Sequence, residues 1–114
     1  MIERFRGRSA FARLRDEGVR ADHDLLWVRF LPEPSLGAAL VAYALPRQSG
    51  SAVMRNKIRR RLREIVKSLD REAPAGLPAG LYLIGTQRGA KGFSHADLRV
   101  SLTTCLAKLD RIAL

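Results

Sequence analysis

The residues with the clearest chemistry form a run of cations between Arg55 and Lys67. Most positions from 55 to 63 are Arg or Lys, and Glu64 is the only acidic residue in the run. Guanidinium groups bind phosphate oxygens through paired hydrogen bonds, and they also stack on nucleobases. Like charges this close repel one another, so a solvated helix face without a partner is the less favoured interpretation. The run therefore indicates a surface that binds a polyanion.

The same run has the periodicity of an amphipathic helix. At 100° per residue, its apolar side chains fall on one stripe and most of its cations on the opposite arc. We expect this helix to begin between Ser49 and Val53 and to end near Arg71. The core-facing stripe comprises Met54, Ile58, Leu62, Ile65, Val66 and Leu69, and the opposite arc comprises Asn56, Arg59, Arg60, Arg63 and Lys67.

The composition of the whole chain favours nucleic acid as the polyanion. The formal net charge is +10 in 114 residues, and most of the 21 cations are Arg. Charge of this size governs association rather than fold. The length predicts one domain over residues 1–114 with a single core. We find neither an apolar run that would span a membrane nor a secretory signal, so we expect a cytoplasmic protein.

Candidate catalytic groups are few. His95 lies beside Ser94 and Asp97, but that spacing is typical of a helix N-terminal cap rather than of a catalytic triad. His23 lies in a polar loop before a strand, flanked by two aspartates whose carboxylates would hold a cation only weakly. We therefore expect no catalytic residue and no metal site on this chain.

A single cysteine, Cys105, excludes an internal disulfide and a cysteine-based metal site. It shares a helical stripe with Leu98, Leu102, Leu109 and Ile112. This pattern predicts a buried thiol in the core of a last helix that starts around Ser94–Asp97.

Several other elements surround the basic helix. Ser9 is expected to cap a short helix that carries Phe11 and Leu14 inward and stops at Gly18. The segment 25–31 is rich in strand-forming residues, and 38–45 returns as a second extended segment, so the pattern fits two or three strands. A loop over 73–80, a strand over 81–84 and a loop over 86–93 precede the last helix. This order predicts an α+β sandwich, which disfavours an isolated helix lying on a membrane surface.

Residues 52–64, AVMRNKIRRRLRE, resemble the arginine-asparagine-arginine motif of the bacterial ribonuclease P protein family. Other segments follow the family's order: 5–11 resembles its N-terminal segment, Gly18 the glycine that closes its first helix, and 47–50 the residues before the motif. Segments 81–84 and 93–98 resemble the last strand and the start of the last helix. The resemblance covers nearly the whole chain, and the central motif is its specific part.

The resemblance implies an α-β-β-β-α-β-α fold with a left-handed β-α-β crossover. It implies a holoenzyme in which a large RNA, using Mg²⁺, removes the 5′ leader from precursor tRNA. The expected partners are ribonuclease P RNA and precursor tRNA, with no cofactor on the protein, no membrane and no obligate protein partner. The alternative is a stand-alone basic RNA-binding module, such as a ribosome-associated protein, with no role in cleavage.

The resemblance also implies a division between two surfaces. In two places Arg stands where the family has an aromatic residue, at Arg15 and Arg29, and guanidinium planes stack on bases as well. Trp27 is either a base-stacking platform or a buried core residue. The expected residues for the catalytic RNA are Arg55, Asn56, Lys57, Arg59, Arg60, Arg63 and Lys67, and those for the leader are Phe11, Arg15, Trp27, Arg29 and Arg47.

Overall fold

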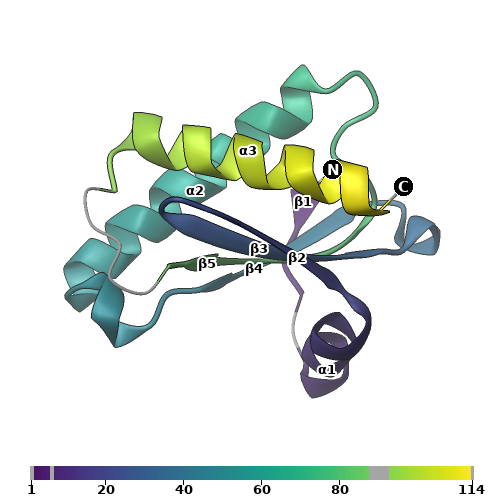
Figure 1. Cartoon of the computed structure of the whole chain (residues 1–114), viewed down its shortest axis with the longest axis horizontal. Coiled ribbons are helices and arrows are strands. Elements are labelled where there is room, and N and C mark those ends of the chain that lie inside the picture. Colours follow the sequence, from purple (N-terminus) through teal and green to yellow (C-terminus); the bar gives the residue numbers. More distant parts are fainter. Residues whose placement is uncertain (1, 6, 88–92, 114) are drawn as a thin grey trace.

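The computed structural model describes residues 2–5, 7–87 and 93–113, which form one sheet with helices on both faces (Figure 1). The predicted α-β-β-β-α-β-α order is confirmed, with a short additional strand at the start. Two single-turn 3₁₀ helices, η1 (Pro34–Leu36) and η2 (Arg47–Ser49), lie in the connections. The main elements are β1 (Ile2–Glu3), α1 (Arg8–Glu17), β2 (Val19–His23), β3 (Leu26–Pro32), β4 (Ala39–Ala44), α2 (Ala52–Glu72), β5 (Gly80–Thr86) and α3 (His95–Ala113).

The sheet is mixed and has the strand order β1-β4-β5-β3-β2. β4 is parallel to both β1 and β5, whereas β3 is antiparallel to β5 and β2. The connection β4–α2–β5 is the β-α-β crossover expected from the resemblance, and its left-handed sense stays a prediction.

Strand β2, with β3 and β4, makes three strands between α1 and the basic helix α2. It pairs with β3 in a hairpin whose turn contains Asp24, at a φ of 51°. Placing His23 in a loop was wrong, because this residue pairs with Leu26 at the end of β2. The polar sequence Val-Arg-Ala-Asp-His hid the strand, since only its central Ala21 is buried.

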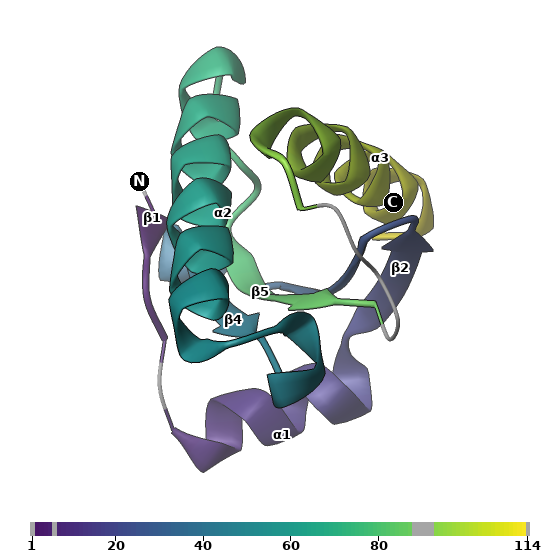
Figure 2. The same cartoon turned by 90° about the vertical axis from the view of Figure 1, so that its left-hand side faces the viewer.

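The two faces of the sheet are covered unequally. α2 and α3 lie side by side on one face, and α1 crosses the other (Figure 1, Figure 2). The larger core lies beneath α2 and α3 and includes Val28, Phe30 and Ile84 of the sheet. A smaller core beneath α1 contains Phe5, Leu14, Ala42 and Leu81. One short helix therefore leaves part of the second face uncovered.

Helix α2 follows its predicted bounds closely. It starts after Ser51, whose Oγ accepts a hydrogen bond from the Met54 N–H at 3.1 Å. Of the predicted stripe, Ile58, Leu62, Ile65 and Val66 are buried and Leu69 is partly buried. Burying Met54 was wrong: it is 39% exposed and lies beside Gly50 in the preceding turn.

Helix α1 differs from its prediction at its start. Gly7, not Ser9, is the N-cap, and Ser9 is already helical. Leu14 points inward as predicted, but Phe11 is 39% exposed and packs instead against the ring of Phe5, at 4.9 Å between centroids. Gly18 ends the helix as expected. Glycine is required at this position, because a Cβ there would lie 2.4 Å from the Leu14 carbonyl oxygen.

Helix α3 confirms the predicted cap and buried stripe. Ser94 Oγ accepts a hydrogen bond from the Asp97 N–H at 3.2 Å. Burial raises the pKa of the Cys105 thiol to about 11, so the thiol stays protonated at neutral pH. Ile112 lies outside the described side chains. The confirmed buried positions of the α3 stripe are Leu98, Leu102, Cys105 and Leu109.

In the described part of the chain, no helix is both long and apolar enough to cross a membrane.

We predict that Leu62→Ala lowers the free energy of unfolding by about 2–5 kcal/mol, because it removes a fully buried side chain between α2 and the sheet. Val53→Ala, on the same helix but 68% exposed, serves as the control and should change it by less than about 0.5 kcal/mol. Urea unfolding measures both. Equal effects of the two substitutions would contradict the assigned inner face of α2.

Candidate nucleic-acid interface

The cationic arc of α2 faces away from the core as predicted. Asn56, Lys57, Arg60, Arg63 and Lys67 are exposed, and Arg59 is half-buried. Asn56 is part of the charged surface, because its Oδ1 accepts a hydrogen bond from Arg59 Nη1 at 2.9 Å. Burial of the opposite stripe therefore orients most of the predicted RNA-binding residues outward.

Two arginines of the run have different surroundings. Arg61, which was not among the predicted site residues, donates a hydrogen bond to the Phe93 carbonyl oxygen at 2.6 Å, so it ties α2 to the segment before α3. Arg55 is half-buried, and its Nε is buried without a hydrogen-bond partner among the described residues. The motif is thus partly structural: Arg61 has a protein partner, whereas Arg55 retains unused donor capacity.

A pocket of about 290 Å³ lies where α2, β4 and the start of α1 meet. We call it the junction pocket. Among its described lining residues are three guanidinium groups and three aromatic rings, and no acidic side chain. Guanidinium groups bind phosphate, and aromatic rings stack on bases. The lining residues are Arg4, Phe5, Gly7, Phe11, Ala42, Tyr43, Arg59 and Arg63.

Tyr43 of β4 and Arg63 of α2 lie next to each other in the lining of the junction pocket. The Arg63 guanidinium carbon lies 6.0 Å from the centre of the Tyr43 ring, within cation–π range. Burial raises the pKa of Tyr43 to about 12, although the nearby Arg63 cation acts in the opposite direction. The phenol is therefore neutral at physiological pH and does not weaken the positive potential of the pocket.

The junction pocket brings together residues that the sequence placed on separate surfaces. Phe11, predicted for the leader, shares it with Arg59 and Arg63, predicted for the catalytic RNA. Sequence reasoning missed Arg4, Phe5 and Tyr43. The alternation of cations with an aromatic residue at Arg4-Phe5-Arg6 was an available signal for the N-terminal segment.

The outer side of α1 presents a second recess. Phe11 and Arg15 lie one helical turn apart and line it together with Gly7, Arg8 and Ala12. Arg15 is exposed, and its one ion pair among the described residues is with its neighbour Asp16, at 3.3 Å, an interaction worth little in water. Its guanidinium is therefore available to a ligand bound along α1.

Trp27 lies on the uncovered part of the sheet face that α1 crosses. It is half-buried, so neither the buried alternative nor a fully open platform describes it. Its ring lies against Gly85 of β5: a Cβ on that glycine would sit 2.2 Å from Trp27 Cζ2. The Arg20 guanidinium carbon lies 4.8 Å from the ring centre, and Asp22 pairs with Arg20 at 2.9 Å. The indole is thus held in place by a glycine and a guanidinium.

Trp27 also lines a pocket of about 370 Å³ with Ala44, Pro46 and Thr86. Ala42 of the junction pocket lies two residues before Ala44 on β4, roughly 7 Å away along the strand. β4 therefore connects the junction pocket to this second pocket, which we call the Trp27 pocket. Arg47, in η2, is exposed directly after Pro46, and Arg29 is half-buried on the same strand face as Trp27.

Ser49 and Thr86 hold this end of the interface together. Their hydroxyl oxygens lie 2.6 Å apart and join η2 to the end of β5. Thr86, expected in a loop, is a buried strand residue. The bond anchors the turn that leads into the basic helix.

The two histidines considered as catalytic candidates lie on separate elements, β2 and α3. Ser94 caps α3, as favoured from the sequence, and His95 is exposed on its first turn. His23 is half-buried, and its Nδ1 has no hydrogen-bond partner among the described residues. The described residues contain no group of three or more His, Cys, Asp or Glu side chains that could hold a metal ion.

Comparison with known proteins gives consistent matches along the chain. A profile of the family described as Ribonuclease P matches residues 2–110. A ribonuclease P protein component from Thermus oshimai is 34% identical over 107 residues, which are 94% of this chain and 64% of that protein. One from Gluconacetobacter diazotrophicus is 31% identical over 105 residues, which are 92% of this chain and 89% of that protein. The chain thus spans less than two thirds of the first relative and most of the second.

Solved structures match the fold. The RNase P protein of Staphylococcus aureus superposes with a TM-score of 0.79 at 22% identity, over 93% of this chain and 95% of that one. The RNase P protein of Thermotoga maritima superposes with a TM-score of 0.71 at 23% identity, over 96% of each chain. The α+β arrangement of sheet and helices is therefore shared with both.

We predict that Gly85→Ala displaces the Trp27 ring and lowers the free energy of unfolding by about 1–3 kcal/mol, because the new methyl group overlaps the indole. Trp27 is the only tryptophan, so its fluorescence emission reports the displacement directly. In a Trp27→Ala background the same substitution should cost clearly less. An equal cost in both backgrounds would contradict the ring–glycine contact.

Proposed function

This chain belongs to the ribonuclease P protein family, and from that membership we propose that it is the protein subunit of a ribonucleoprotein that removes the 5′ leader of precursor tRNA. Its partners are a ribonuclease P RNA and precursor tRNA, in the cytoplasm. The hydrolysis belongs to the RNA, whose Mg²⁺ ions supply the metal chemistry. The protein contributes binding and positioning, without a catalytic residue, a metal of its own or an obligate protein partner.

The junction pocket is the observation that supports this function most strongly. It joins two motif arginines of α2 to the aromatic side chain of α1. A protein that holds one RNA against another needs such a meeting point, because each phosphate backbone repels the other unless cations lie between them. We assign the cationic arc of α2, together with the neighbouring Arg55 and Lys57, to the catalytic RNA. The assigned residues are Arg55, Asn56, Lys57, Arg59, Arg60, Arg63 and Lys67.

The leader is assigned to the face that α1 leaves open. The junction pocket and the Trp27 pocket both reach β4, and the recess along α1 shares Phe11 with the junction pocket, so the three form a discontinuous track. Aromatic and guanidinium groups along this track stack on unpaired bases with little dependence on base identity. The assigned residues are Phe11, Arg15, Trp27, Arg29 and Arg47. We add Arg4, Phe5 and Tyr43, which line the junction pocket.

The second candidate is a stand-alone RNA-binding module that uses the same cationic arc. The two functions differ in one assay. In the proposed function, the protein added to a bacterial ribonuclease P RNA and a precursor tRNA promotes leader removal at physiological Mg²⁺. Binding of RNA without any stimulation of cleavage would favour the stand-alone module.

We predict that Arg59→Glu combined with Arg63→Glu weakens holoenzyme assembly at least about tenfold and reduces processing at low Mg²⁺. If about six phosphates are neutralised in the native complex, the slope of log affinity against log salt is roughly −4 to −5, and each lost contact makes it shallower by about 1. Filter binding over a salt series measures the affinity and its salt slope, and the leader-removal assay measures processing.

A matched pair of single variants controls for the change of net charge. Arg71 is exposed in the last turn of the same helix, so Arg71→Glu alters the charge as much as Arg63→Glu does. Assembly should be weakened by Arg63→Glu and changed little by Arg71→Glu. Equal effects of the two would mean that overall charge, and not the arc, determines binding.

We predict that Trp27→Ala weakens the holoenzyme's affinity for a precursor tRNA with a long leader at least about fivefold, since stacking is worth about 1–3 kcal/mol per base. A substrate with a single-nucleotide leader is the control and should be bound equally by both proteins. Trp27→Phe, which keeps an aromatic ring, should retain most of the affinity. An equal loss for both substrates would remove Trp27 from the leader site.

A further inference from the structure

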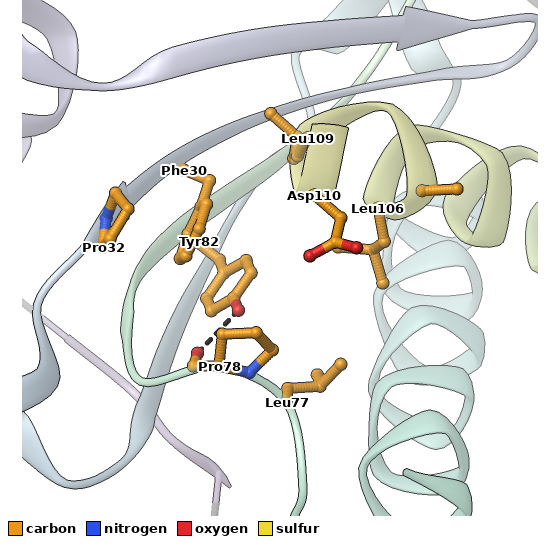
Figure 3. A pocket seen from close by; sticks show the side chains of 9 residues that line it. Phe30, Pro32, Leu77, Pro78, Tyr82, Leu106, Leu109 and Asp110 are labelled. Atoms are coloured by element: carbon orange, nitrogen blue, oxygen red, sulfur yellow. Dashed lines mark hydrogen bonds between the residues drawn. The ribbon is translucent and has the colours of Figure 1, made fainter. Parts of the chain in front are cut away.

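A separate pocket lies on the other face of the sheet, between the C-terminal half of α3, strands β3 and β5, and the loop after α2 (Figure 3). We call it the α3 pocket. Its volume is about 370 Å³, within the range of small-molecule sites. None of the residues assigned to RNA binding lines it. The lining residues are Phe30, Pro32, Leu77, Pro78, Tyr82, Leu106, Ala107, Leu109 and Asp110.

The walls of the α3 pocket are held by specific contacts. The rings of Phe30 and Tyr82 stack with centroids 4.5 Å apart. The Tyr82 hydroxyl donates a hydrogen bond to the Pro78 carbonyl oxygen at 2.6 Å, and the Leu77 N–H donates one to Asp70 Oδ1 at 2.8 Å. The first bond fixes the loop to β5 and the second fixes it to the end of α2, so the pocket is formed without a ligand.

The polar groups of the pocket define the ligand. Among the described lining residues, only Tyr82 and Asp110 have polar side chains. The Tyr82 hydrogen is already used on Pro78, which leaves the phenol oxygen as an acceptor, and the Asp110 carboxylate is an acceptor only. Pro32 and Pro78 have no N–H to donate. Both side chains point into the same space (Figure 3), so a fitting ligand brings hydrogen-bond donors and an apolar body.

We propose that the α3 pocket binds a small aromatic amine in its protonated form. The ring of the amine packs among Phe30, Leu106 and Leu109, and its ammonium group donates hydrogen bonds to Asp110 and Tyr82. A cation suits this place, because the carboxylate is the one charged group among the described lining residues and it lies near the C-terminal end of a helix, where the helix dipole is negative. The site is independent of the proposed RNA-binding function, since it uses other residues.

The test is a titration of the full chain with 4-fluorophenethylamine, followed by ¹⁹F NMR of the probe. The uncharged 4-fluorophenethyl alcohol, of nearly the same shape, is the comparison ligand. We expect the amine to bind more tightly than the alcohol. Methyl resonances of Leu106 and Leu109 should shift on binding, which locates the amine in this pocket.

Three variants separate charge, shape and unrelated effects. Asp110→Asn should weaken amine binding about two- to fivefold, as expected for an exposed charge, and leave alcohol binding unchanged. Ala107→Phe, at an exposed lining position, should fill the entrance and abolish binding of both ligands. Thr103→Phe, also exposed one turn earlier on α3, should change neither.

Several results would overturn the proposal. They are no binding of the amine at millimolar concentration, alcohol binding as tight as amine binding, unchanged amine affinity in Asp110→Asn, and unchanged binding in Ala107→Phe. Circular dichroism of each variant confirms that the fold is retained. Stimulation of leader removal by ribonuclease P RNA does not enter this test, so either proposal can fail without the other.

Discussion

Burial of one side of α2 against the sheet is the constraint on which the rest of the molecule depends. Leu62 and Ile65 are fully buried, and apolar burial of this kind contributes roughly 1.5–3 kcal/mol per large side chain. That free energy holds a helix whose other side is dense in mutually repelling cations. The same packing aims Arg59 and Arg63 toward α1. The core thus stabilises a charge distribution that an isolated helix would not tolerate well.

The uneven covering of the sheet follows from the lengths of the helices. α2 and α3, with 21 and 19 residues, cover one face, whereas the 10-residue α1 crosses the other. Gly85 lets the Trp27 ring lie close against β5, and Ala44 lines the same pocket as the ring. Aromatic surface is therefore kept partly exposed at a defined place. The proposed binding surface is therefore a consequence of an incompletely covered sheet and not of a separate loop.

Much of the fold was predictable because its signals are local. The 3.6-residue period of α2, the Ser94 cap of α3 and the Gly18 stop of α1 depend on neighbours within a few positions. Two of the failed predictions share a cause. β2 is a strand because β3 offers it hydrogen bonds, and Phe11 is outward because Phe5 meets its ring there. Neither contact is specified by the period of the element in which the residue lies.

The sequence by itself determined that the chain has an amphipathic cationic helix and a buried thiol at Cys105. It also carried the family resemblance, since the motif is a contiguous segment. Only the tertiary structure decided that Arg4 and Tyr43 join Phe11 and Arg63 around one pocket, and that Trp27 rests on Gly85. The physical reason is that periodicity specifies which side of an element is buried, whereas the neighbours across a cleft depend on how separate elements pack.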